Sequence, residues 1–259
     1  MPTLLAIIPH PDDESYSFAG TIALAARAGW RCLLYCATNG EAGERHDGGP
    51  RRKAVLGADR FAELAASCAL LGAEPPSAWA LPDGALDARP PESTRIRHLF
   101  RELQPALVLT LGADGAYGHP DHLAVHRWIA AAWHGLSGER PALLYAAFPK
   151  GLMLPQYEKC VASGVMGRPP HLRSSDIGRA DPHYRVPLAA VSDLKLASIA
   201  AHRTQLPGGD PHALFPRGIV AALLEEERFT DASAAPEPAT ERLLGQFAAA
   251  AEQSAPPRR

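Results

Sequence analysis

The sequence lacks the features that mark membrane proteins and nucleic-acid-binding proteins. No stretch reaches about 18 uninterrupted apolar residues, so we expect no membrane-spanning helix. The 26 basic and 28 acidic residues leave a formal net charge of −2. This balance predicts neither an electrostatic footprint for nucleic acid nor a polybasic membrane anchor. We therefore expect the partner to be a small molecule.

Cysteine is also scarce, and its spacing is not that of a cysteine-based site. The four cysteines include no C-x-x-C pair. Cys32 and Cys36 share one face of a strand-like run but lie too far apart to bridge readily. We expect reduced core thiols in a cytoplasmic protein. The apolar residues 4–8 are too few for the core of a signal peptide and are expected to form the first strand.

The common nucleotide-binding motifs are absent as well. A dinucleotide-binding fold carries G-x-G-x-x-G after its first strand, and a P-loop protein carries G-x-x-x-x-G-K-[ST]. Here the first strand is followed by Pro-His-Pro-Asp-Asp-Glu at residues 9–14, and the P-loop pattern does not occur. A nucleotide ligand is therefore not expected.

What the sequence does contain predicts an α/β fold. Its 259 residues, 46% of them hydrophobic, can bury a sizeable core, and we expect one domain over the whole chain. Apolar strands alternate with helical patterns, which predicts a Rossmann-like open, mostly parallel sheet with helices on both faces. The expected strands cover 3–8, 31–38, 78–81, 106–111 and 143–147, and the expected helices cover 15–28, 51–71, 92–103, 121–133 and 190–202.

The alternation stops after residue 147, where the predicted core ends. Residues 148–187 are rich in Pro, Gly, Arg and isolated aromatics and are too long for an ordinary connection. We expect a lid-like segment that sets substrate specificity, with or without short strands. Its candidate residues are Lys150, Tyr157, Arg168, Arg173 and Tyr184. Residues 188–259 should add further helices and strands and a tail whose parts 232–238 and 254–259 are loosely ordered.

Two motifs rich in histidine and aspartate follow predicted strands. Residues 10–14 (HPDDE) follow the first strand, and residues 118–122 (GHPDH) follow the strand at 106–111. Ligands of open α/β sheets bind outside the carboxyl ends of the strands, so the two motifs should meet there. His10, Asp13 and His122 can supply the three ligands of a catalytic zinc site. Ferrous iron also favours two histidines and one carboxylate.

The tandem aspartates would then have different functions. With Asp13 on the metal, Asp12 is free to remove a proton from the water that attacks a carbonyl. Taken alone, either aspartate would be expected to cap the helix that begins near residue 15. The histidine before them and the second histidine cluster favour the metal site.

Six short segments, in one order along the chain, resemble the LmbE-like (PIG-L) family of zinc-dependent N-deacetylases. This family includes N-acetylglucosaminyl-phosphatidylinositol deacetylases and the deacetylases and amidases of mycothiol and bacillithiol metabolism. The resemblance implies a metal-dependent hydrolase that removes an acetyl group from an N-acetylglucosamine-type amine. The segments are 9–14 (PHPDDE), 38–44 (TNGEAGE), 60–64 (RFAEL), 81–84 (LPDG), 117–122 (YGHPDH) and 201–205 (AHRTQ).

The resemblance also implies roles for single residues. His10, Asp13 and His122 match the metal ligands and Asp12 the general base. His119 matches the histidine that stabilises the tetrahedral intermediate or protonates the leaving amine. Residues with further expected roles are Tyr117, as a donor to the oxyanion, and Arg60 and Asp83, as contacts to the sugar or its attached group.

Several of these residues have alternative interpretations. Asp121 should orient His119 and raise its pKa, or simply cap the helix that it begins. Arg60 could instead pair with Glu63 on a solvated helix face. Glu14 is expected to contact the metal ligands and not the metal itself. His202 could be a cap or a packing residue at the end of its helix, or it could support the site together with Gln205.

The function has alternatives too. The chain could be an amidase that cleaves a larger acyl group from a thiol conjugate, or a zinc-dependent sugar-binding protein without turnover. The sequence also leaves open whether the chain forms a homo-oligomer.

Overall fold

The computed structural model describes residues 1–253, which build one seven-stranded sheet in the order β3-β2-β1-β4-β5-β7-β6. The strands from β3 to β5 are parallel, whereas β7 runs antiparallel to both β5 and β6. The predicted open, mostly parallel α/β sheet is thereby confirmed. The strands are β1 (Thr3–Ile8), β2 (Arg31–Thr38), β3 (Ser77–Leu81), β4 (Leu107–Leu111), β5 (Ala142–Ala146), β6 (Tyr184–Pro187) and β7 (Glu226–Asp231).

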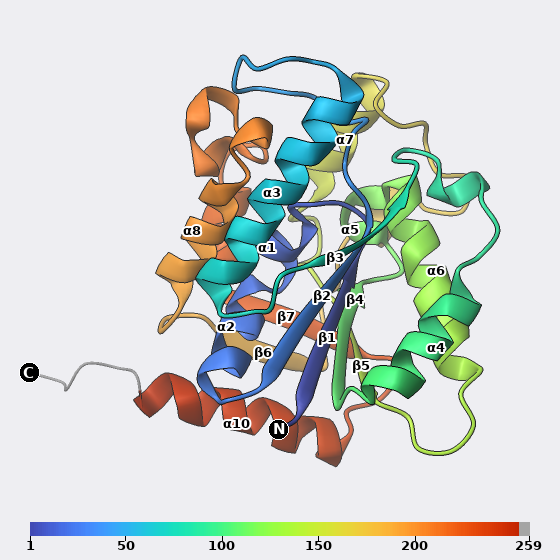
Figure 1. Cartoon of the computed structure of the whole chain (residues 1–259), viewed down its shortest axis with the longest axis vertical. Helices are drawn as coiled ribbons and strands as arrows, with labels where there is room; N and C mark the ends of the chain where they lie inside the picture. Colours follow the sequence, from blue (N-terminus) through green and yellow to red (C-terminus); the bar gives the residue numbers. More distant parts are fainter. Residues whose placement is uncertain (254–259) are drawn as a thin grey trace, which may run out of the picture.

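Helices cover both faces of the sheet, as Figure 1 shows, with α2, α3 and α8 on one side and α4 and α6 on the other. The helices are α1 (Asp13–Ser17), α2 (Ala19–Arg27), α3 (Lys53–Leu71), α4 (Ser93–Leu103), α5 (Gly115–Gly118), α6 (Pro120–His134), α7 (Leu154–Ala162), α8 (Ser192–Ala201), α9 (Ile219–Leu223) and α10 (Pro238–Gln253).

The central strand β1 explains why its sequence is apolar without alternation. Leu4, Ala6 and Ile8 belong to the core on one side of the sheet, and Leu5 and Ile7 to the core on the other. All five are fully buried. A strand that is covered on both faces exposes no side chain to solvent, so polar residues need not alternate with apolar ones. The polar residues of this region therefore begin only after the carboxyl end of the strand.

The predicted helix over 15–28 is two helices, because the chain breaks at Phe18 (φ −154°, ψ 20°). The second helix, α2, is capped from a distant strand. Glu227 on β7 accepts hydrogen bonds from the backbone N–H groups of Gly20 (2.9 Å) and Thr21 (2.8 Å). These are N–H groups that a helix start leaves without internal partners. A cap that lies 207 residues along the chain leaves no local sequence signal.

The C-terminal part also differs from the prediction. Segment 148–187 contains the helix α7, which was not expected, and the short strand β6, and the strand expected somewhere in 188–259 is β7. The predicted loose segment at 232–238 is tied to the sheet: Ser233 binds Asp231 through its backbone N–H (3.0 Å) and its hydroxyl (2.8 Å), and the N–H of Glu237 donates to the Tyr184 hydroxyl (2.6 Å). The predicted loose end at 254–259 lies outside the described residues.

The structure bears on the expectations for the cysteines and for membrane-spanning helices. All four cysteines are buried and unpaired, as predicted. Within residues 1–253, no helix has the combined length and apolarity that crossing a membrane requires.

Candidate active site

The two motifs rich in histidine and aspartate meet at the carboxyl end of the sheet, as predicted from its topology. His10 follows β1, Asp13 begins α1, and His122 lies in the first turn of α6. The His10 Nδ1 atom is 3.2 Å from His122 Nε2. Asp13 lies between the two rings, with Oδ2 at 3.4 Å from His10 Nδ1 and Oδ1 at 3.3 Å from His122 Nε2. All three side chains are buried.

The outer nitrogens of both rings are engaged by acceptors. His122 Nδ1 lies 3.0 Å from the carbonyl oxygen of Gly115, to which it can only donate. His10 Nε2 lies 3.0 Å from a carboxylate oxygen of Asp83 and 3.2 Å from one of Asp121. The protons therefore lie on the outer nitrogens, and the inner nitrogens present lone pairs to each other.

This arrangement fits a cation. Two imidazole lone pairs and the Asp13 carboxylate converge within 3.4 Å of one another, and such donors repel unless positive charge lies between them. Without a metal, that charge is a proton. Burial opposes it, but hydrogen bonds to Asp121, Asp13 and Asp83 raise the pKa of His10 well above its usual value. Spacings of this size also suit ligand atoms that each lie about 2.0 to 2.2 Å from one zinc ion.

Two overlapping groups of side chains place possible ligand atoms within 4.8 Å of one another: His10–His119–His122 and His10–Asp83–Asp121. In the second group the oxygens already accept backbone hydrogen bonds. Asp121 accepts from the N–H groups of Gly84 and Leu86, and Asp83 from that of Ala42. We therefore assign the two carboxylates as partners of His10 and regard the inner side of the ring, towards His122, as the side that could hold a metal.

Asp12 lies beside this group but points to a different partner. Its Oδ2 is 3.2 Å from Nη2 of Arg60. Burial raises the pKa of Asp12 to about 6, although the Arg60 guanidinium opposes the shift; the neighbouring Asp13 carboxylate adds to it. A carboxyl group with this pKa can exchange a proton near neutral pH.

His119 differs from its predicted state. Its Nδ1 accepts the backbone N–H of Asp121 at 3.3 Å, so the proton of the neutral ring lies on Nε2. Burial and the nearby rings of His122 and His10 lower the pKa of His119 to about 3. The Asp121 carboxylate binds His10 and backbone N–H groups instead of the His119 ring, although its charge raises the pKa of His119 and its N–H binds the ring. The net lowering of this pKa does not favour the cation expected from the sequence.

A cavity opens beside the possible metal site, and its lining includes His10, Asp12, Tyr117 and His119. Burial, followed by the nearby Asp13 carboxylate, raises the pKa of Tyr117 well above its usual value, so the phenol keeps its proton. Among the described residues the Tyr117 hydroxyl has no hydrogen-bond partner. It is consequently a free donor at the cavity wall.

Arg60 and Asp83 line the same cavity, and both form hydrogen bonds to other groups of the protein, although Nε of Arg60 has no partner. The Arg60 guanidinium donates to the carbonyl oxygens of Gly40 (2.7 Å) and Pro11 (2.6 Å). The alternative pairing with Glu63 is not formed, since that carboxylate binds Thr204. The direct sugar contacts expected of Arg60 and Asp83 remain predictions.

The lid-like segment reaches the cavity through residues that sequence reasoning missed. None of its five candidates is among the described residues that line the cavity. Tyr157 and Tyr184 are buried in the core instead. The lining comes from one face of α7 and the residues after it, which only the packing of α7 reveals: Gln156, Lys159, Cys160, Ser163 and Val165.

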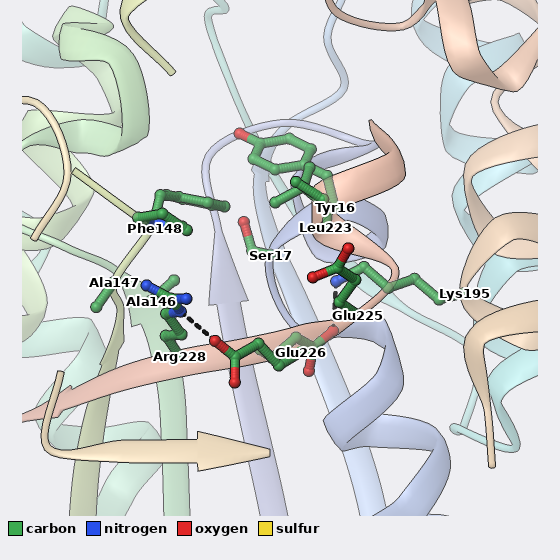
Figure 2. Close-up of a pocket in the computed structure, with 13 residues that line it drawn as sticks. Tyr16, Ser17, Ala146, Ala147, Phe148, Lys195, Leu223, Glu225, Glu226 and Arg228 are labelled. Carbon is green, nitrogen blue, oxygen red and sulfur yellow. Dashed lines mark hydrogen bonds and ion pairs between the residues drawn. The ribbon is translucent and has the colours of Figure 1, made fainter. Parts of the chain in front are cut away.

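A second cavity lies next to the site and shares Tyr16 with it. The Tyr16 hydroxyl donates to Asp13 at 2.5 Å, while its ring borders the second cavity (Figure 2) together with Ser17, Phe148 and Lys195. Lys195 is fully buried and forms a 2.6 Å ion pair with Glu227. No histidine lines this cavity, so we regard the first one as the candidate active site.

The structure thus combines an open α/β sheet with a buried group of histidines and aspartates that could hold a metal ion. The family model PIG-L, described as GlcNAc-PI de-N-acetylase, matches residues 5–133. A 1D-myo-inositol 2-acetamido-2-deoxy-alpha-D-glucopyranoside deacetylase from Nakamurella multipartita is 33% identical over 245 residues, which cover 79% of this chain and 81% of the relative. The chain belongs to the PIG-L family.

Solved structures share the fold at lower identity. The conserved protein TT1542 from Thermus thermophilus matches with a TM-score of 0.61 and 24% identity, over 92% of this chain and 97% of that one. GalB, a 4-carboxy-2-hydroxymuconate hydratase from Pseudomonas putida, matches with a TM-score of 0.61 and 18% identity, over 89% of this chain and 96% of that one. A deacetylase-family fold can therefore accompany different chemistries, and the function must be argued from the site.

Proposed function

We propose that this protein is a metal-dependent deacetylase that hydrolyses the acetamide of an N-acetylglucosamine conjugate. The observation that carries the proposal is the convergence of His10, Asp13 and His122 beside a separate carboxyl group, Asp12, whose pKa is about 6. This arrangement provides one set of groups for binding a cation and another for moving a proton.

His10, Asp13 and His122 would hold the metal. When bound, zinc would supply Lewis acidity and lower the pKa of a bound water to about 7. Ferrous iron suits the same ligands. The Asp83 and Asp121 carboxylates keep His10 in the tautomer that binds metal through Nδ1, and the Gly115 carbonyl does the same for Nε2 of His122.

Asp12 would act as the general base. Its carboxylate accepts a proton from the water that attacks the acetyl carbonyl, and the new C–O bond turns that carbonyl oxygen into an oxyanion. The Arg60 contact at 3.2 Å holds the carboxylate in place. The protonated Asp12 can then return the proton to the nitrogen as the C–N bond breaks, which releases acetate and the free amine.

Tyr117 and His119 would stabilise the oxyanion. The phenol of Tyr117 keeps its proton, and His119 is neutral with a proton on Nε2. Both groups can therefore donate hydrogen bonds to the developing negative charge. A neutral imidazole acts here as a donor and not as an acid, which differs from the cationic role expected from the sequence.

The substrate class follows from the relatives and the cavity. The curated relative from Nakamurella acts on a 2-acetamido sugar linked to inositol, and we propose a related N-acetylglucosamine conjugate here. The residues of α7 that line the cavity, Gln156 and Lys159 among them, would contact the group attached to the sugar. The alternative amidase would share this site but accept a larger acyl group.

Acetate release tests the proposal directly. The purified chain, with its metal content measured, is given 1-O-(2-acetamido-2-deoxy-α-D-glucopyranosyl)-inositol, and acetate and free amine are quantified together. We expect both products in equal amounts, their loss with a chelator and their return with zinc. Binding without product at full metal occupancy would point to the sugar-binding alternative, and cleavage of long-chain acyl conjugates only would point to the amidase.

A further inference from the structure

Asp12 has a backbone conformation that side chains of L-amino acids rarely adopt. Its φ is 104° and its ψ is −23°. Such conformations persist only where the surroundings hold them in place, and they are common at catalytic positions. The residue is not glycine, so the side chain at position 12 must matter enough to keep the strain.

Hydrogen bonds hold Asp12 on both sides of the strained position. Arg60 donates to the carbonyl oxygen of Pro11, just before Asp12. The carbonyl oxygen of Asp12 accepts the Ser15 N–H at 3.0 Å and its hydroxyl at 2.7 Å. The N–H of Asp12 donates to Oε2 of Glu14 at 3.2 Å. The Arg60 and Glu14 contacts both depend on groups that are anchored outside the loop.

Glu14 is itself anchored by two distant helices. Its other oxygen, Oε1, accepts the Ser67 hydroxyl of α3 at 2.6 Å and lies 2.7 Å from Nε2 of His202, at the end of α8. The Ser67 hydroxyl also lies 2.7 Å from that of Ser198. All four side chains are fully buried. The carboxylate therefore has one oxygen fixed to α3 and α8 and the other on the backbone of Asp12.

We propose that Glu14 and His202 are positioning residues that hold Asp12 in its left-handed conformation and so aim its carboxylate at the reacting water. The inference rests on the proposed role of Asp12 as the base. His202 does not line the cavity, and its hydrogen bond in this group is to Glu14. A base that shifts by about 1 Å can lose on the order of 10²-fold in rate, so the pair should affect kcat more than KM.

The test separates positioning from simple core packing by a double-mutant cycle. His202→Leu removes the donor to Glu14, and His202→Gln keeps a donor near the position of Nε2. Each is combined with Asp12→Asn, and kcat, KM and metal content are measured with the inositol conjugate. We expect His202→Leu to lower kcat about tenfold or more at unchanged metal content and KM within about twofold, and His202→Gln to recover most of the loss.

The double mutant gives the decisive outcome. If His202 acts through Asp12, adding His202→Leu to Asp12→Asn should lower kcat no further. An equal loss in both backgrounds, or a wild-type kcat in His202→Leu, would overturn the proposal. Failure of the proposed function is distinguishable, because the wild type would then release no acetate from the conjugate. Failure of the base assignment is distinguishable as well, because Asp12→Asn would then be as active as the wild type.

Lys195→Met is the matched control, since Lys195 belongs to another fully buried ion pair of α8 and has no contact with Asp12. It should lower the melting temperature and leave kcat unchanged. If His202→Leu does not fold, Ser67→Ala replaces it, as this smaller change removes the hydroxyl that binds Glu14 and Ser198. A kcat lowered in the wild-type background alone supports positioning, and an unchanged kcat overturns it.

Discussion

His10 Nδ1 lies 3.2 Å from His122 Nε2, although 112 residues separate the two histidines in the chain. The contact exists because β1 and β4 are neighbours in a parallel sheet, so their carboxyl ends open into the same crevice. Each ring is turned to this position by an acceptor on its outer side. The proposed metal site is thus the result of sheet topology together with the partners of the two rings.

The Asp83 carboxylate should affect metal affinity, because it accepts the Nε2 proton of His10 at 3.0 Å. We expect Asp83→Asn to weaken zinc binding by about 10- to 100-fold, the range usual for lost partners of metal-binding histidines. Competition with a fluorescent zinc chelator measures the change. Asp87→Asn, a change in a surface residue nearby whose side chain is 57% exposed, should leave the affinity unaltered. Equal affinities in both variants would contradict the assigned role of Asp83.

His119 should act as a neutral donor. The pKa of His119 is lowered to about 3 and that of Asp12 raised to about 6, so a single acid limb from Asp12 should dominate the pH profile. We expect kcat to rise as the pH passes about 6 and Asp12 loses its proton. His119→Ala should lower kcat by about 10²-fold, as for other oxyanion donors, and keep this limb. A limb that vanishes in His119→Ala at full metal occupancy would assign the titration to His119.

The pair of Glu227 and Lys195 should dominate the stability of the region around α2. Glu227 caps α2 through Gly20 and Thr21 and neutralises Lys195 in a fully buried ion pair. Glu227→Ala leaves a buried lysine without a partner, which typically destabilises a protein by about 3–5 kcal/mol. Urea unfolding measures the loss.

The neighbouring Glu226 is a suitable control for Glu227. It forms ion pairs with Arg185 and Arg228 but is partly exposed, so Glu226→Ala should change the free energy of unfolding by about 1 kcal/mol or less. Similar losses in the two variants would contradict the importance assigned to the buried pair.

His202 should make the stability of the metal-free protein depend on pH. Burial and the Arg60 charge lower its pKa, but the Glu14 carboxylate and the more distant Asp12 raise it above its usual value. A raised pKa in the folded state stabilises the protein fully below the unfolded pKa of about 6.5, and this stabilisation is lost as the pH rises through the folded-state value.

Thermal unfolding across pH 5 to about 9 tests this sign. Relative to His202→Gln, the wild type should have its largest advantage in melting temperature at the acidic end, and the advantage should shrink towards alkaline pH. An advantage that grows with pH would mean that His202 is neutral in the folded protein.

The sequence predicts much of this fold because its signals are local. The apolar run of β1 and the sharp ends of the helices at Gly29 and Gly72 are visible without a structure. The break at Phe18 and the position of β7 are not, because the helix that follows the break is capped by Glu227 of β7, which lies far along the chain and also binds Lys195. A strand with the sequence Glu-Glu-Arg-Phe-Thr-Asp has too few apolar residues to be recognised alone.

In the candidate site, too, some features follow from local sequence and others depend on contacts with distant parts of the chain. The positions of His10, Asp13 and His122 follow from motifs and topology, but the partner of each polar atom does not. Asp121 lies two residues from His119, and spacing alone favours a contact between them. In the structure the turn at the start of α6 directs the Asp121 carboxylate to His10 and to the backbone at 84–86. Its direction depends on a loop 35 residues earlier in the chain.

The central claim is that adjacent aspartates divide the work, with Asp13 binding the metal and Asp12 moving the proton. The most direct measurement compares Asp12→Asn and Asp13→Asn for zinc content and kcat in the same preparation series. Asp12→Asn should keep about one zinc ion per chain and lose at least about 10²-fold in kcat, whereas Asp13→Asn should lose the zinc itself. Zinc retained in Asp13→Asn and lost in Asp12→Asn would reverse the assignment, and near-normal turnover of Asp12→Asn would contradict it.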